Sequence, residues 1–478
     1  MAPNRQILQV AFCLILAIVP ISFSQVNSHG QKLAFTHVAV IDATGSPTKF
    51  DMTVVIDGDR IAQIEKSRKT KLSSDVRAVN ASGKFLIPGL WDMHVHLWSK
   101  EVFFPLLLAN GVTGVRDMGS PLDQIKQWRV EMASGTLLGP HIFAAGLIVD
   151  GPKPGCGPCS IAVGTPEEGR KAVQTVKQQG SDFVKVYTML PRDAYFAIAD
   201  EAKLQHMVFA GHVPESISAR EASDAGQKSI EHLMDILVSC SSKENELRRE
   251  NEARLRKDGL RAMTSTLEQA AALDSFDQKH ATALFAKFVK NGTWMCPTLS
   301  VLRAEALIGD PGFTTDDRVK YVPPFIKHFW DDPYSVKGRT AQENETAKRV
   351  YEAQLDLVGR MHRAGVQFIA GTDSPNPFVF PGFSLHEELE LLVQAGFTPT
   401  EALQSATRNA AEYLGLSRWE GTIETGKHAD LVLLDADPLE NINNTRKIRG
   451  VILDGKLIEK PELEKMLADA ETAAKGAH

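Results

Sequence analysis

The sequence predicts an α/β protein, a (β/α)8 TIM barrel that carries a small β-sandwich domain formed from both termini. From about residue 89 to 419, short apolar runs alternate with amphipathic segments of helical period, which is the rhythm of a parallel sheet. Near the two ends of the chain, an Asp-Gly pair between apolar runs predicts a β-hairpin, first at Asp57-Gly58 and again at Asp454-Gly455.

The domain boundaries follow from these patterns. Residues 31–88 and 420–460 are predicted to form the composite β-sandwich domain, residues 89–419 the barrel, and residues 461–478 a helical tail. The charged stretch 241–290 is predicted to be solvent-facing helix between the sixth and seventh barrel strands. The eight expected barrel strands are 90–96, 112–118, 142–149, 183–188, 207–212, 229–233, 293–299 and 366–372.

The N-terminus has the pattern of an export signal. One charge, Arg5, precedes an apolar run over residues 7–23 that ends in small residues at Ser22 and Ser24. This predicts a secretory signal peptide over residues 1–24, and hence a secreted or periplasmic protein without membrane contact after cleavage. An uncleaved membrane anchor is the alternative, although the run is barely long enough to span a bilayer.

Length and charge limit the function further. The 478 residues, 43% of them hydrophobic, suffice for a large core and a smaller second one. The formal net charge of −6 argues against a surface that neutralises phosphates, so nucleic acid is not expected as a partner. A small-molecule substrate is expected, and homo-oligomerisation stays open.

Residues that bind metals recur at the ends of the predicted strands. His94 and His96 end the first strand, and the period of two puts both imidazoles on one face, which makes half of a divalent metal site. In a (β/α)8 barrel the carboxyl ends of all strands meet at one mouth, where catalysis takes place. Four further residues stand at such ends: Lys185, His212, His232 and Asp373.

Each of these residues also has a simpler explanation. His212 and His232 are compatible with hydrogen-bonded core histidines, and Asp373 with a helix cap. Lys185 could extend its ammonium to the rim. A lysine inside a barrel is costly when charged, however, so its pKa falls and it becomes suited to carboxylation by carbon dioxide. The product would be a carboxylate that bridges two metal ions.

The order His-x-His, Lys, His, His, Asp resembles that of the amidohydrolase superfamily. The resemblance extends to the lead-in 87–94, to Gly371-Thr-Asp-Ser374 and to the segment 407–415, and so covers nearly all of the chain after the predicted signal. It is most similar to the imidazolonepropionase-related and metal-dependent prolidase- or carboxypeptidase-like branches. These motifs are specific for the superfamily and say little about the substrate.

The resemblance implies a site with two divalent metal ions, for which zinc is the best match. His94, His96 and Asp373 would hold one ion, His212 and His232 the other, and carboxylated Lys185 would bridge them. Asp373 would also take a proton from a bridging water. Tyr187, two residues beyond Lys185 and on the same face, is a candidate hydrogen-bond donor to the substrate. The implied activity is hydrolysis of an amide (C–N) bond in a small substrate such as an N-acyl amino acid or dipeptide.

Two other functions stay open. A mononuclear deaminase acting on a cyclic amine or nucleobase-like substrate is suggested by His212-Val-Pro-Glu215, although such enzymes do not rely on a lysine like Lys185. A non-catalytic barrel relative is the second alternative. No phosphate-binding loop or dinucleotide fingerprint is present, so no nucleotide cofactor is expected.

The pair Cys156 and Cys159 forms a Cys-Gly-Pro-Cys motif. No second Cys-x-x-Cys completes a structural zinc site. In an exported protein the motif therefore predicts a small disulfide in the loop after the third barrel strand.

Overall fold

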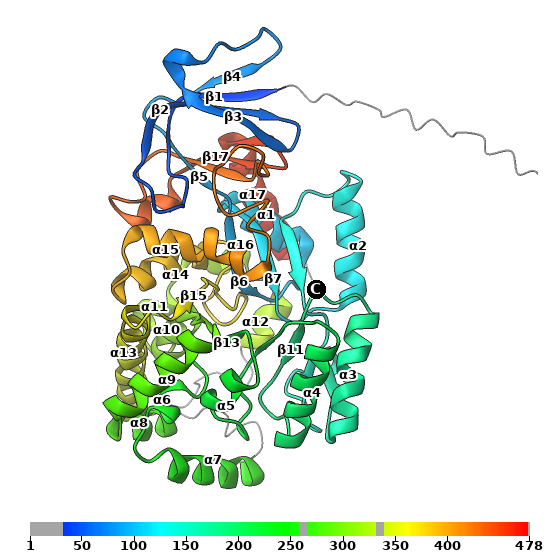
Figure 1. Cartoon of the computed structure of the whole chain (residues 1–478), viewed down its shortest axis with the longest axis vertical. Helices are drawn as coiled ribbons and strands as arrows, with labels where there is room; N and C mark the ends of the chain where they lie inside the picture. The colour runs from blue at the N-terminus through cyan, green and yellow to red at the C-terminus, as the bar shows by residue number, and fades with distance from the viewer. Residues whose placement is uncertain (1–31, 259–265, 331–338, 477–478) are drawn as a thin grey trace, which may run out of the picture.

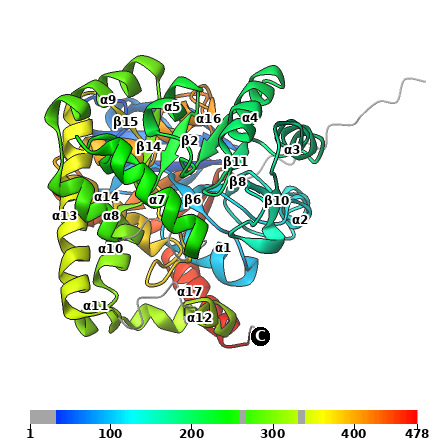
Figure 2. The same ribbon diagram turned by 90° about the horizontal axis from the view of Figure 1, so that it is seen from below.

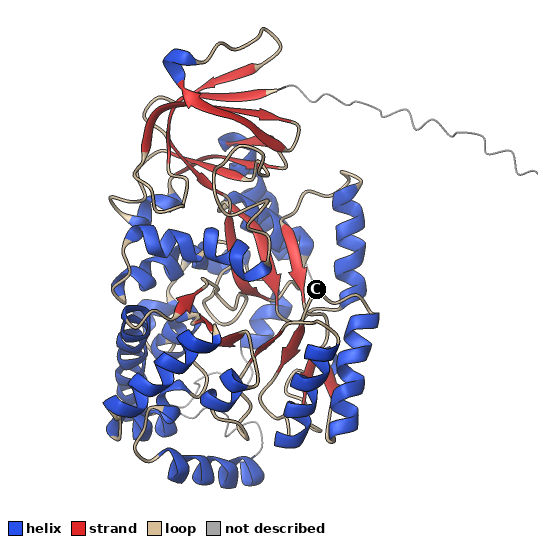
Figure 3. Ribbon diagram, in the orientation of Figure 1, coloured by secondary structure: helices blue, strands red, loops and turns tan. Residues whose placement is uncertain are grey.

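The computed structural model describes residues 32–258, 266–330 and 339–476. A sheet rich in antiparallel pairs lies at one end of the molecule, and the parallel strands lie in the body beneath it among the helices (Figures 1 and 3). The predicted signal peptide, residues 1–24, lies outside the described residues. Among the residues that are described, no helix is both long and apolar enough to cross a membrane.

Both ends of the chain contribute to one eight-stranded sheet. The N-terminal strand β5 pairs antiparallel with the C-terminal strand β16, which places Leu86 opposite Leu433. The strands of this terminal sheet are β1 (Leu33–Val40), β2 (Lys49–Asp57), β3 (Arg60–Lys66), β4 (Arg77–Asn80), β5 (Phe85–Pro88), β16 (Leu431–Leu434), β17 (Ile448–Leu453) and β18 (Lys456–Glu459).

Both predicted hairpins are confirmed. Asp57 pairs with Arg60 where β2 turns into β3, and Leu453 pairs with Lys456 where β17 turns into β18. Gly58 and Gly455, within these turns, have φ of 62° and 74°, a region that glycine enters without steric cost. The hydrogen bonds run through a single continuous sheet. Its packing as a sandwich, and the domain boundaries, stay predictions.

The remaining strands pair only in parallel, in the orders β6-β7-β8 and β10-β9-β11-β12-β13-β14-β15. This confirms the α/β class with parallel sheets. The strands are β6 (Leu90–Val95), β7 (Val112–Asp117), β8 (His141–Ala144), β9 (Ile148–Asp150), β10 (Ser160–Ala162), β11 (Val184–Val186), β12 (Phe209–Gly211), β13 (Ser229–Glu231), β14 (Trp294–Cys296) and β15 (Gln367–Phe368).

The segment that follows the last parallel strand lies beside the first, β6. The backbone N–H of Met93 in β6 donates to the carbonyl of Ala370, and that of Asp373 donates to the carbonyl of His94. The prediction of one unbroken third strand over 142–149 was wrong. Gly146, with φ of 71°, separates β8, which pairs with β7, from β9, which pairs with β11.

Helices lie on both sides of the parallel strands, with α2, α3 and α4 on one side and α8, α9, α10 and α13 on the other (Figure 2). The helices are α1 (Lys100–Ala109), α2 (Leu122–Ala133), α3 (Pro166–Gln178), α4 (Arg192–Leu204), α5 (Ala219–Asp224), α6 (Ile236–Ser239), α7 (Glu244–Asp258), α8 (Thr266–Asp274), α9 (Gln278–Asn291), α10 (Leu299–Leu307), α11 (Pro311–Thr314), α12 (Pro324–Trp330), α13 (Ala341–Arg363), α14 (Phe383–Gln394), α15 (Pro399–Ser405), α16 (Arg408–Leu414) and α17 (Lys460–Gly476).

Local sequence explains several helix starts. Thr165, Thr340 and Thr398 begin α3, α13 and α15 with reciprocal bonds between the threonine and a glutamate three residues later. The charged stretch 241–290 forms α7, α8 and most of α9, and α7 turns Leu247 and Asn251 inward. The predicted helical tail corresponds to α17, which packs on α1.

Candidate metal centre

The structure brings the predicted ligands together at the carboxyl ends of the parallel strands. His94 lies in β6 and Lys185 in the middle of β11, while His212 and His232 directly follow β12 and β13. Asp373 lies on the segment after β15, which runs beside β6. Parallel pairing of β11 with β12 and of β12 with β13 aligns these ends at one edge.

Three of these residues form a tight group. The Nε2 atoms of His94 and His96 lie 3.4 and 3.3 Å from Oδ1 of Asp373. Each of the three side chains offers a ligand atom within 4.8 Å of the other two. His94 and Asp373 are buried, whereas His96 keeps 19% of its side chain exposed. These are the residues predicted to hold one metal ion.

The other predicted residues adjoin this group. The ring of His232 lies 4.6 Å from that of His94 and 4.9 Å from that of His212, centroid to centroid. The ring of Tyr187 lies 4.1 Å from that of His212, and Nζ of Lys185 is 5.8 Å from the Tyr187 ring centroid. All six predicted ligands and Tyr187 therefore belong to one connected cluster.

Every histidine of the cluster is oriented through its Nδ1 atom. Nδ1 of His94 meets Glu231 at 2.8 Å, and Nδ1 of His96 donates to the Gly119 carbonyl at 3.2 Å. The hydroxyls of Thr188 and Thr298 meet Nδ1 of His212 and His232, both at 2.7 Å. Such partners fix the imidazole and leave Nε2 as the nitrogen available to a metal ion. The sequence patterns did not identify these partners.

Glu231 connects His94 to a buried arginine. Its Oε2 accepts from Nη2 of Arg116 at 2.8 Å, and both side chains are wholly buried. Arg116 also donates to the Met93 carbonyl, to the Ser229 hydroxyl and to the Tyr413 hydroxyl. In the sequence, Arg116 and Glu231 each stand as a charged residue within a strand that is otherwise buried. This pattern indicates a polar network beneath the ligands.

Lys185 is held in a space that glycine leaves open. A Cβ on Gly211 would lie 2.9 Å from Cδ of Lys185 and 2.2 Å from the Val186 carbonyl oxygen. Gly211 also has φ of 136°, which L side chains rarely adopt. Burial lowers the pKa of Lys185 to about 8 despite the nearby carboxylates Glu231 and Asp373. Lys185 therefore loses its proton and becomes a neutral amine at a lower pH than an exposed lysine does.

The imidazoles and the carboxylate shift each other's protonation. Burial alone would raise the pKa of Asp373, but His94, His232 and His96 hold it below its usual value. Burial, with the Lys185 charge, lowers the pKa of His94 and His212. Burial also lowers the pKa of His232 to about 4. Burial would lower the pKa of His96, but its contact with Asp373 raises it above the ordinary value. An ionised Asp373 beside neutral His94, His212 and His232 is the protonation state in which these side chains ligate metals.

Two buried atoms bear on whether this cluster fits a metal centre. Within the described part of the chain, Nζ of Lys185 and Oδ1 of Asp373 make no hydrogen bond of good geometry. Buried polar groups are otherwise almost always satisfied. Together with the Nε2 atoms, they form a nitrogen and oxygen donor set that fits divalent metal ions.

Glu215, the residue that suggested a deaminase, has another environment. Its carboxyl group accepts a hydrogen bond from Asn251 of α7 and lines a cavity with Asp235 and Glu268. Burial, followed by the charges of Glu268 and Asp235, raises its pKa to about 8. The contact with α7 accounts for Glu215 without a part in the metal cluster.

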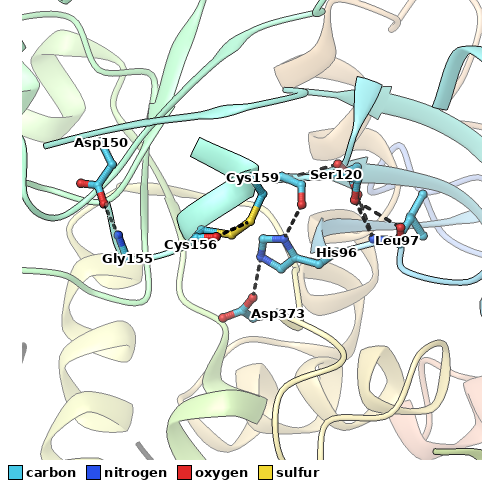
Figure 4. Close-up of a disulfide and its surroundings, with 10 residues drawn as sticks. His96, Leu97, Ser120, Asp150, Gly155, Cys156, Cys159 and Asp373 are labelled. Atoms are coloured by element: carbon cyan, nitrogen blue, oxygen red, sulfur yellow. Dashed lines mark hydrogen bonds and ion pairs between the residues drawn. A yellow bond between two sulfur atoms is a disulfide. The ribbon is translucent and has the colours of Figure 1, made fainter. Parts of the chain in front are cut away.

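The predicted disulfide is confirmed. Cys156 and Cys159 are joined, with 5.5 Å between their Cα atoms, in the loop after β9. Asp150 anchors this loop through hydrogen bonds from the backbone N–H groups of Gly155 and Met189. Figure 4 shows the disulfide in one close-up with His96 and Asp373 of the cluster.

Comparison with known proteins agrees with this geometry. The model of the amidohydrolase family matches residues 85–458. An ochratoxinase from Aspergillus niger is 23% identical over 443 residues, with 79% of this chain and 76% of that protein covered. An imidazolonepropionase from Maricaulis maris is 39% identical over 117 residues, covering 24% of this chain and 27% of that protein.

A solved Xaa-Pro dipeptidase with bound methionine in its active site has a similar fold, with a TM-score of 0.63, 21% identity and coverage of 90% of this chain and 100% of the other. The resemblance noted in the sequence is thereby confirmed. The family is generally metal-dependent and acts on small molecules. The chain belongs to the amidohydrolase family and is a hydrolase.

Proposed function

We propose that this enzyme hydrolyses an amide bond in a small substrate, such as an N-acyl amino acid or a dipeptide, with two divalent metal ions held by the cluster. One observation carries the proposal: four buried or half-buried histidines, each oriented through Nδ1, surround an ionised carboxylate and a buried lysine. A set of side chains held in this way suits a metal centre better than a packed core.

His94, His96 and Asp373 would hold one ion, His212 and His232 the other, and carboxylated Lys185 both. When bound, two divalent ions polarise a scissile carbonyl and lower the pKa of water. Zinc suits these ligands best, and manganese, iron and cobalt are compatible.

Asp373 is the candidate base. Its carboxylate stays ionised among the imidazoles, and Oδ1 makes no hydrogen bond of good geometry within the described residues. It can accept the proton that the attacking water loses and return it to the amine as the C–N bond breaks, so no net proton is consumed by the residue.

Lys185 and Tyr187 have separate tasks. Neutral Nζ of Lys185 attacks carbon dioxide, which forms an N–C bond and releases one proton to solvent. The resulting carbamate carries one negative charge, and burial favours this reaction because it lowers the pKa of the amine to about 8. Tyr187, packed against His212, can donate a hydrogen bond to a substrate carbonyl or carboxylate.

The proposal extends to the closure of the barrel, the terminal domain and export of the protein. We infer that the two parallel sheets form one closed (β/α)8 barrel, since the bonds of Met93 and Asp373 join β6 to the segment after β15. The terminal sheet would pack on it as a β-sandwich domain. Residues 1–24 would direct export, which suits the Cys156–Cys159 disulfide. Determining the N-terminal residue of the secreted protein tests whether residues 1–24 are removed on export.

Lys185→Ala tests the proposed activity. Activity on dipeptides and N-acyl amino acids should fall nearly to background, and formate or acetate should restore part of it by supplying the missing carboxylate. Lys228→Ala is the matched control, because Lys228 is half-buried and donates to the Tyr413 carbonyl outside the cluster. Full activity of Lys185→Ala would exclude the bridging role. Ammonia release from aminopurines without amide cleavage would favour the deaminase instead.

A further inference from the structure

A second cluster of histidines and carboxylates lies where the terminal sheet meets the parallel strands. His141 begins β8, so it stands at the opposite end of the strands from the metal centre. Asp430 directly precedes β16, and Asp454 lies in the turn between β17 and β18. Two groups of ligand atoms, each within 4.8 Å, share Asp430: one with His141 and Asp454, the other with Glu420 and His428.

One imidazole nitrogen faces two carboxylates in this junction cluster. Nε2 of His141 makes a hydrogen bond of 3.1 Å to Oδ2 of Asp430 and lies 3.5 Å from Oδ1 of Asp454. Charge-assisted N–H···O bonds measure about 2.7–2.9 Å. One Nε2 carries a single hydrogen and cannot donate well to both carboxylates. Two ligands about 2.0–2.2 Å from a tetrahedral zinc ion are about 3.3–3.6 Å apart.

The 3.5 Å separation between His141 and Asp454 is close to that in the candidate metal centre, where Nε2 atoms lie 3.3 and 3.4 Å from Oδ1 of Asp373. The other oxygen of Asp430 is oriented by the backbone N–H of Asp454 at 2.8 Å. That bond holds the two carboxylates in place relative to each other and turns Oδ2 of Asp430 toward His141.

Imidazoles are the basic groups that face the carboxylates of the junction cluster. Within the described residues, no lysine or arginine forms an ion pair with Glu420, Asp430 or Asp454. Nδ1 of His428 is buried and has no hydrogen-bond partner there. Three carboxylates and two imidazoles, with one nitrogen unsatisfied, form a donor set typical of divalent transition-metal ions.

We propose that His141, Asp430 and Asp454 bind a structural divalent metal ion such as zinc. The ion would join the start of β8 to both C-terminal segments of the terminal sheet. The ion would lie away from the cluster that carries the proposed activity. It would hold the terminal sheet and the parallel strands together.

The test uses the His94→Ala/His96→Ala variant of the full mature chain, in which the candidate metal centre is impaired. This protein is stripped with a chelator and dialysed against buffered free Zn²⁺ or Co²⁺, and bound metal is measured by elemental analysis. Adding Asp454→Asn or His141→Ala to this variant should weaken the binding of one equivalent by at least about tenfold. Zn²⁺ should also raise the Tm of the double variant, and this increase should be absent in the triple variants.

Asp59→Asn is the matched control, because Asp59 is an exposed neighbouring carboxylate outside both ligand groups. It should bind metal like its parent. Asp454 has 55% of its side chain exposed, so Asp454→Asn keeps the buried packing intact, and circular dichroism of the stripped proteins checks this. Equal metal binding with and without Asp454→Asn and His141→Ala would overturn the proposal. So would loss of binding in Asp59→Asn to the same degree.

Discussion

Replacing Glu231 with glutamine separates two tasks of one buried carboxylate. Glu231 accepts from Nδ1 of His94 and from Nη2 of Arg116, both at 2.8 Å, and from the hydroxyl of Ser229. Glutamine keeps the shape and one acceptor oxygen but removes the charge. His94 then faces a neutral amide that orients it less firmly than the carboxylate, and Arg116 keeps its charge without a buried counter-ion.

The expected magnitudes follow from these contacts. Loss of a partner that orients a metal-binding histidine lowers metal affinity by about 10- to 100-fold. Removing one member of a buried ion pair costs about 3–5 kcal/mol, and Arg116 and Glu231 are both 0% exposed. Unfolding entropy of about 2.1 cal/mol/K per residue amounts to about 1 kcal/mol/K for 478 residues, so Tm should fall by about 3–5 °C.

Zinc affinity is measured by competition with a chromogenic chelator, and Tm by calorimetry of metal-free protein. Glu215→Gln is the control, because this buried carboxyl group contacts Asn251 instead of a histidine of the cluster. Adding Arg116→Met to Glu231→Gln should restore part of the lost Tm and leave the zinc affinity low. Zinc affinity within twofold of wild type in Glu231→Gln would refute the orienting role, and an unchanged Tm would refute the role of the ion pair.

Three further changes have distinct expected results. Asp373→Asn should lower kcat by about 10²- to 10⁴-fold with metal content near wild type, and near-normal kcat would exclude Asp373 as the base. Burial lowers the pKa of His386 to about 3, so the unfolded chain takes up the proton first as the pH falls below about 6.5. The loss of unfolding free energy between pH 7 and pH 5, measured by calorimetry, should therefore be about 2 kcal/mol smaller in His386→Gln than in wild type and unchanged in the exposed control His328→Gln. Equal losses in wild type and His386→Gln would refute this role of His386. Gly211→Ala should lower the free energy of unfolding, measured with denaturant, by more than about 2 kcal/mol and reduce metal uptake. Gly226→Ala is the control: Gly226 also has positive φ, but a Cβ there would meet open space, so the variant should lose only the cost of backbone strain. Equal losses in the two variants would refute the steric argument.

The local patterns of the sequence determined much of this architecture. Alternating apolar runs place His94, Lys185 and His232 in or directly after strands, because a period of two and a buried strand are properties of a few neighbouring residues. The Asp-Gly turns at both ends likewise depend only on local backbone preferences. The order of metal-binding residues along the chain was enough to indicate the family, which the match over residues 85–458 shows.

Tertiary structure decided what no local pattern contains. Whether Gly146 interrupts the third strand depends on which neighbours β8 and β9 pair with. The partners that orient the histidines come from other strands or their ends, such as Glu231 for His94, which is 137 residues away in the sequence. The cluster of His141, Asp430 and Asp454 likewise joins segments about 300 residues apart. Spacing along the chain indicates which residues can bind a metal, but only the packed strands determine which nitrogen of each histidine faces it.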